Sequence, residues 1–142
     1  MSAVSDFATS TGPLIRAVLS ALRANTEVQA IFGAPARLYD GQASGAYYPY
    51  AVLERCESQT ANGVVHRGFE HTLHVAAFSR NAGVEASKDM LSMLRVAIEQ
   101  LDLSPTDQKL LLILPTYSDV LRTKNPSVLR GVLRVRLRTE EV

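Results

Sequence analysis

The chain has 142 residues, of which 46% are hydrophobic and 20% are charged, and its formal net charge is +1. This length and apolar content are enough for one domain with a buried core. The near-zero net charge excludes a general electrostatic attraction to nucleic acid or to a membrane surface. The single cysteine, Cys56, excludes an internal disulfide, as expected of a protein that is kept in a reducing compartment.

The first part of the chain predicts two helices. Residues 1–10 are small and polar, are expected to be flexible, and lack the basic cluster and apolar core of a signal peptide. A helix is predicted to begin at Pro13, because proline suits the first helical position, where its missing N–H is not needed. This helix carries an apolar face over residues 14–22, and a second, short helix is expected to end at Gly33.

The next part predicts a short strand followed by a long hairpin. Residues 37–40 resemble a short strand, and residues 50–60 resemble a longer one that begins after Pro49. Asn62 and Gly63 tolerate the positive φ angles of a type I′ turn, so they are predicted to join this strand to residues 64–79. Because the distal half of the hairpin is polar, we expect it to project from the domain and to contact a neighbouring molecule.

The longest helical pattern spans residues 83–101. Leu91, Leu94 and Ile98 recur at spacings of three and four, and the charged side chains fall mostly elsewhere. Such a helix is roughly 28 Å long, enough to cross a small sheet once. We therefore expect it to organise the sheet.

The C-terminal part predicts a second hairpin. Residues 110–123 form a strand that is bent at Pro115, and residues 129–139 form a strand with clean alternation. One face of this last strand carries Leu133, Val135 and Leu137, and the other carries Arg134, Arg136 and Arg138. The arginine row is expected to lie on an open face of the sheet.

Taken together, the predicted elements indicate an α+β fold in one domain over residues 1–142. We expect a mainly antiparallel sheet of four to five strands. The long helix and the N-terminal helix are predicted to pack on one face of it, and a β-hairpin to project from it. No apolar run approaches the ~18 residues of a membrane span.

The sequence contains no convincing catalytic, cofactor-binding or metal site. His71 and His74 are three residues apart on a predicted strand, so their side chains point to opposite faces and cannot share one ion. Cys56 has no paired histidine in a recognisable setting, so a half-buried thiol is favoured over a nucleophile. Phosphate loops and dinucleotide-binding glycine patterns are missing from the sequence. An enzyme is therefore not predicted.

The arginine row, together with Arg130 on the same strand, is the only local concentration of charge. It is open to three interpretations: a solvated strand face, a contact with an acidic patch on a partner protein, or a contact with phosphates. No aromatic residues are interleaved with it, which argues against binding of single-stranded nucleic acid.

Four stretches of the sequence resemble the tail-completion, or tail-terminator, proteins of long-tailed phages and of phage-like gene transfer agents. The first is the helical region over residues 14–33. The second combines RLYD at 37–40 with YPYAVL at 48–53. The third is HTLHVAAFSR at 71–80, followed by a glycine and the long helix, and the fourth is LRGVLRVR at 129–136. They span nearly the whole chain in the family's order.

The resemblance implies a structural virion protein without catalysis or cofactors. Family members are similar to small α+β subunits that close into a ring, typically of six, at the head–tail junction. The ring caps the tail tube, faces the head connector or a stopper protein, and lets DNA pass without sequence-specific binding. Assembly in the host cytoplasm, without a membrane, is expected. The alternatives are another neck protein such as a stopper or adaptor, a free nucleic-acid-binding domain, and a small enzyme.

A ring of identical subunits needs two different contact surfaces on each subunit. The first candidate is the aromatic cluster of Tyr47, Tyr48 and Tyr50, because aromatic residues are enriched in interface cores. The second is the row of Arg134, Arg136 and Arg138, whose side chains are expected to pair with carboxylates such as Glu54 or Glu57 of the next subunit. The hairpin tip with Asn62 and Gly63 is expected to reach a neighbouring subunit or the tail tube.

Overall fold

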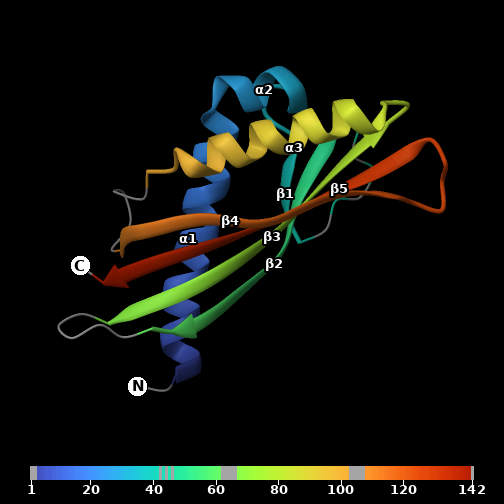
Figure 1. The fold of residues 1–142 in the computed structure, drawn as a ribbon. Helices are drawn as coiled ribbons and strands as arrows, with labels where there is room; N and C mark the ends of the chain where they lie inside the picture. The colour runs from blue at the N-terminus through green and yellow to red at the C-terminus, as the bar shows by residue number, and fades with distance from the viewer. Residues whose placement is uncertain are drawn as a thin grey trace.

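The computed structural model describes residues 3–41, 43, 45, 47–61, 67–102 and 108–141, with side chains described from residue 12 onward. These residues form an α+β fold around one five-stranded sheet with the strand order β1-β2-β3-β5-β4 (Figure 1). In chain order the elements are α1 (Ala3–Ala24), α2 (Thr26–Phe32), β1 (Leu38–Asp40), β2 (Tyr50–Thr60), β3 (Gly68–Arg80), α3 (Val84–Glu99), β4 (Gln108–Arg122) and β5 (Val128–Glu141).

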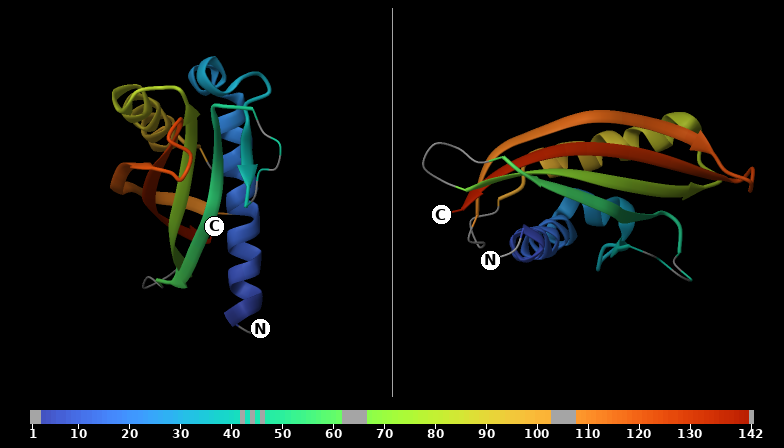
Figure 2. Two further views of the ribbon diagram at one scale, coloured as in Figure 1. Left: turned by 90° about the vertical axis from the view of Figure 1, so that its right-hand side faces the viewer. Right: turned by 90° about the horizontal axis from the view of Figure 1, so that it is seen from below.

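Both long helices pack on the same face of the sheet. α1 lies along β1 and β2, whereas α3 crosses β5 and β4 (Figures 1 and 2). Their apolar stripes meet the inward-facing side chains of the strands in one cluster, which includes Leu22, Leu94, Val75 and Leu133. The predicted layering, with two helices on one face of a mainly antiparallel sheet, is therefore confirmed.

The short strand β1 is the one parallel member of the sheet. Leu38, Tyr39 and Asp40 pair in parallel with residues 51–53 of β2, while the β2–β3, β3–β5 and β5–β4 pairs are all antiparallel. The described residues between β1 and β2, which are 41, 43, 45 and 47–49, contain no helix. β1 thus covers only the first part of β2, and residues 54–60 of β2 have a strand neighbour on the β3 side alone among the described residues.

The first helix begins earlier than the sequence predicts. α1 starts at Ala3, so Pro13 lies inside the helix instead of at its first position. Proline removes one backbone hydrogen bond from a helix interior, but residues 3–10 contain nothing else that forbids helix. The prediction failed because Pro13 was taken as a start signal on its own.

Strand boundaries agree well with the predicted hairpins. β2 has the predicted bounds, β5 extends the predicted strand by one or two residues at each end, and β4 begins two residues earlier and ends one earlier. β3 begins at Gly68, and the proposed turn at Asn62 and Gly63 lies outside the described residues. The predicted bend near Pro115 is present as a register shift between Pro115 and Tyr117.

Gly131 allows α3 to approach β5 closely. A Cβ atom at this position would lie 3.0 Å from three carbon atoms of the Leu91 side chain. Leu91 is almost fully buried, at 4% exposure. The glycine therefore sets the distance between the helix and the sheet.

We expect Gly131→Val to lower the free energy of unfolding by about 1–3 kcal/mol, because the added methyl groups overpack this contact. Urea denaturation measures the change. The double variant Leu91→Ala/Gly131→Val should be more stable than the sum of the two single changes predicts, since valine fills space that the leucine vacated. Strict additivity would show that the two residues do not compete for the same space.

Candidate assembly interface

The face of the sheet away from the helices is polar in its middle and carries the arginine row. Arg134 and Arg136 are exposed and Arg138 is half-buried, while Leu133, Val135 and Leu137 lie in the core. The alternation predicted for this strand is therefore confirmed. We call this side of the sheet the open face.

The arginines of the open face have partners within the chain. The Arg136 Nε atom lies 2.8 Å from a carboxylate oxygen of Glu70, and Arg138 donates a hydrogen bond of 3.3 Å to the carbonyl oxygen of Ala61. Arg130, also on β5, reaches across β3 to pair with Glu54 on β2. Arg134 lies over the ring of Tyr117 on β4, 4.9 Å from its centroid.

The carboxylates that were expected to meet the next subunit also have partners in the same chain. Glu54 pairs with Arg130, and Glu57 contacts both Arg55 and His74, the latter at 2.8 Å. Exposed ion pairs of this kind are worth about 0–1 kcal/mol each. Contacts with a neighbouring subunit would have to replace these intrachain ion pairs. The role of the arginine row at an interface therefore stays a prediction.

The three tyrosines predicted as an interface cluster fall into two environments. Tyr50 stacks on Phe78 with a centroid distance of 5.0 Å and lies 5.3 Å from Tyr48. Burial, with a smaller contribution from Tyr48, raises the pKa of the Tyr50 hydroxyl. Tyr47, by contrast, is 81% exposed. Tyr48 and Tyr50 thus belong to a cluster within the chain, and Tyr47 alone presents most of its ring to solvent.

The remaining polar candidates lack the geometry of a catalytic or metal site. His71 is fully buried on the helix-facing side of the sheet, while His74 lies on the open face, so the predicted opposite orientation is confirmed. Burial raises the pKa of the Cys56 thiol to about 11, which disfavours the thiolate. Groups of three or more metal-ligating side chains are absent from the described residues. No described helix is long and apolar enough to span a membrane.

Buried His71 holds together the distal part of the sheet. Its Nδ1 atom lies 2.7 Å from the Ser58 hydroxyl on β2, and its Nε2 atom lies 3.0 Å from the Thr139 hydroxyl on β5. One ring nitrogen of a neutral imidazole donates and the other accepts, and hydroxyl groups can serve either. Burial lowers the pKa of His71 to about 4, so the ring is neutral at physiological pH.

Sequence reasoning missed the most unusual surface of the molecule, the edge strand β4. Its exposed large apolar side chains have exposures of 40–45% and are Leu111, Leu112, Leu114, Tyr117 and Leu121. Leu110 and Ile113 pack against the core from the same strand. A strand that is apolar on both faces is typical of a sheet's interior, yet β4 is the last strand of this sheet. The apolar run at 110–114 was the available signal, but the sequence did not show that the strand is an edge.

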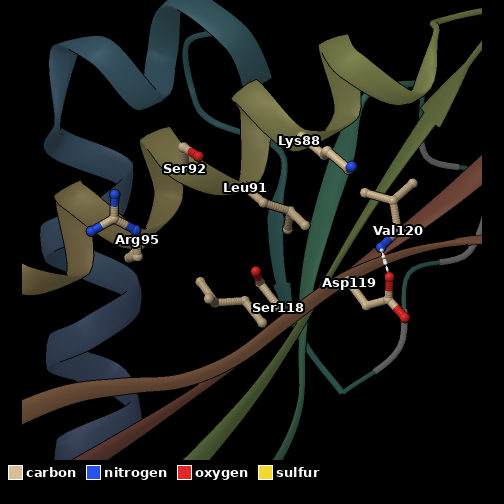
Figure 3. A pocket seen from close by; sticks show the side chains of 8 residues that line it. Lys88, Leu91, Ser92, Arg95, Ser118, Asp119 and Val120 are labelled. Atoms are coloured by element: carbon tan, nitrogen blue, oxygen red, sulfur yellow. Dashed lines mark hydrogen bonds between the residues drawn. The ribbon is translucent and has the colours of Figure 1, made fainter.

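An open groove of about 370 Å³ lies between β4 and α3 (Figure 3). Lys88, Leu91, Ser92 and Arg95 line it from α3, and Ser118, Asp119 and Val120 line it from β4. The Asp119 side chain points away from Lys88 and accepts a 2.8 Å hydrogen bond from the backbone N–H of Val120 (Figure 3). This lining pairs no nucleophile with a base.

Comparison with known families identifies the chain. The sequence model of the family described as tail completion protein gp17 matches residues 16–140. The chain belongs to this tail-completion family. The resemblance found in the sequence is thereby confirmed, and the chain is a structural protein of phage-type tails.

The fold is also shared with a chain of known structure. A chain in the virion of a native gene transfer agent particle superposes with a TM-score of 0.71 and 21% sequence identity. The match covers 92% of this chain and 96% of that one. Comparison with curated protein sequences gave no significant match. For a tail-completion protein, the exposed edge strand and the open face are candidates for assembly contacts.

Proposed function

We propose that this tail-completion protein is the tail terminator of its particle. In this role it forms a ring, with six subunits, that caps the finished tail tube and joins it to the head connector or stopper. The observation that carries the proposal is the family match over residues 16–140. The shared fold with a gene transfer agent virion chain supports it.

The two edges of the sheet suit a cyclic assembly. A ring needs one subunit to present two different surfaces, each contacting the other on the next copy. In this chain β4 presents an apolar edge, whereas residues 54–60 of β2 present a polar edge on the opposite side of the same sheet. Identical edges would instead favour a closed pair.

The partners follow from this role. The ring contacts the tail tube protein on one side and the head connector or stopper on the other, in the virion at the head–tail junction after assembly in the host cytoplasm. DNA passes through without sequence-specific binding, since the net charge is only +1 and the arginine row has intrachain partners. A stopper or adaptor at the same junction is the competing function.

The test is a producing strain whose copy of the gene is deleted and complemented from a plasmid. Electron microscopy of the deletion strain should show overlong or headless tails, and complementation should restore joined particles. Averaged images of the junction should show six copies of the chain on the last ring of the tube. Properly closed tails joined to heads in the deletion strain would refute termination, and five-fold or seven-fold symmetry at this layer would refute the hexamer.

A further inference from the structure

The edge strand β4 is long and exposes apolar side chains, although it carries a proline and two register shifts of the kind found at protected sheet edges. Protected edges are short, charged or covered, whereas β4 has 15 residues and the exposed apolar side chains named above. Its pairing with β5 is interrupted by two register shifts, one between Leu110 and Leu112 and one between Pro115 and Tyr117, and Pro115 removes one backbone donor. The segment 110–117 therefore resembles a strand that is covered in the assembled state.

A matching segment lies at the opposite edge, at the same height across the sheet. Following the strand pairing from one side to the other, Glu57 pairs with Thr72, Thr72 with Arg136, and Arg136 with Leu114. The part of β2 that β1 leaves uncovered, residues 54–60, thus stands in the same rows as residues 110–117 of β4. The two segments are also of nearly equal length.

Strand direction suits a joint between these two segments. Three successive antiparallel pairings make β4 run opposite to β2 within one subunit. Rotation about an axis roughly along the strands preserves each strand's direction. In such a ring, β4 of one copy meets β2 of the next in the antiparallel orientation and at the same height, with no shift along the axis.

One pair of opposite charges is available at the two edges, Arg134 beside β4 and Glu57 on β2, while Arg55 of β2 stands in the same row as Tyr117. Arg134 lies over Tyr117, so its guanidinium is placed above the edge strand, and it forms no ion pair with a carboxylate in the described part of the chain. Arg130 shows that an arginine on β5 can reach across one strand to a carboxylate, since it pairs with Glu54 across β3. By the same reach, Arg134 can meet Glu57 on a strand added beside β4.

We propose that the ring closes by strand addition between two copies of this chain. Residues 110–117 of β4 in one copy pair with residues 54–60 of β2 in the next, which extends the sheet from subunit to subunit. The apolar side chains Leu112 and Leu114 become covered, and Arg134 pairs across the joint. This inference rests on the proposed ring and specifies its contact.

The first test places charges on the edge. Leu112→Lys/Leu114→Lys should reduce the yield of complete particles roughly 100-fold or more, since both side chains lie at the centre of the joint. The matched control is Val84→Lys/Val96→Lys, which changes two apolar side chains of similar exposure, 39% and 37%, on α3. The control should stay within about twofold of wild type. Thermal unfolding of both purified variants should match wild type, because all four side chains are exposed.

A second test uses cross-linking in assembled tails to identify the molecule that pairs with β4. In a Cys56→Ser background, Gln59→Cys and Leu112→Cys place thiols in the same row at the two edges. Mild oxidation should give a ladder of covalent oligomers ending at the ring. Neither single cysteine, nor Gln59→Cys combined with Lys88→Cys on α3, should give one. These cysteines leave Arg134 and Glu57 unchanged.

The outcomes separate this inference from the proposed function. If wild type restores joined particles but the lysine variant does so equally well and no ladder forms, the strand joint is wrong while termination stands. A cross-link from Leu112→Cys to a different tail protein would show that β4 pairs with that protein and not with a second copy of this chain. If the deletion strain makes normal junctions, the proposed function itself fails.

Discussion

Leu94→Ala is expected to lower the free energy of unfolding by about 3–4 kcal/mol, which is within the usual range for a substitution that leaves a cavity in place of a buried leucine. Leu94 is 0% exposed and lies where α3, α1 and the sheet meet, beside Leu22, Leu53 and Val75. Removing three carbon atoms there withdraws contacts from three elements at once. Because a domain of this size is stable by only about 5–15 kcal/mol, the change should be visible in any denaturation curve.

Urea denaturation at fixed pH measures this effect, with Val96→Ala as the matched control. Val96 lies on the same helix but is 37% exposed, so its truncation should change stability by no more than about 0.5 kcal/mol. Nearly equal midpoints for the two variants would contradict a core that is closed at Leu94.

His71 is expected to make the fold less stable as the pH falls from neutral to 4. Burial lowers the pKa of His71 from 6.5 to about 4, so the folded state holds the ring neutral where the unfolded chain binds a proton. The stabilisation is therefore complete above pH 6.5 and is lost progressively between pH 6.5 and 4. The gap between the two pKa values corresponds to about 3 kcal/mol.

The measurement compares wild type with His71→Gln and His74→Gln in urea at pH 7, 5.5 and 4. Carboxylates also titrate in this range, so the informative quantity is the difference between proteins. His71→Gln should be less stable than wild type at pH 7, because the hydrogen bond to Ser58 or the one to Thr139 is lost. Its stability should, however, fall less than that of wild type as the pH is lowered. His74→Gln, changed on the open face, controls for the replacement of a histidine by glutamine. A parallel fall for wild type and His71→Gln would exclude this histidine as the cause.

Periodicity alone was sufficient for the elements whose faces differ strongly. The leucines and valines that alternate with arginines on β5 predicted which face is buried, because successive side chains of a strand point to opposite sides. The spacing of Leu91, Leu94 and Ile98 predicted α3 for the corresponding helical reason. The family resemblance also came from the sequence, through the order of four weak motifs, and it pointed to an assembly protein rather than an enzyme.

Predictions from single residues or adjacent residues were wrong where the surrounding helix or the strand pairing determined the structure. Pro13 is typical of a helix start, yet α1 runs through it from Ala3. Tyr48 and Tyr50 were grouped with Tyr47 because they are adjacent in sequence, but the strand pairing of Tyr50 with Phe78 draws them into a cluster within the chain. The partners of Glu54 and Arg136 likewise depend on which strands are neighbours, and the sequence does not state this.

The sequence by itself determined the α+β class, the bounds of the central strands and helix, and the family, since these depend on patterns within short stretches. Only the tertiary structure decided that the apolar strand β4 lies at the edge of the sheet and that β1 leaves residues 54–60 of β2 uncovered. The physical reason is that strand order arises from pairing between residues distant in the chain. The same apolar run would be ordinary in the middle of the sheet, and at the edge it becomes the surface on which we expect the next subunit to add.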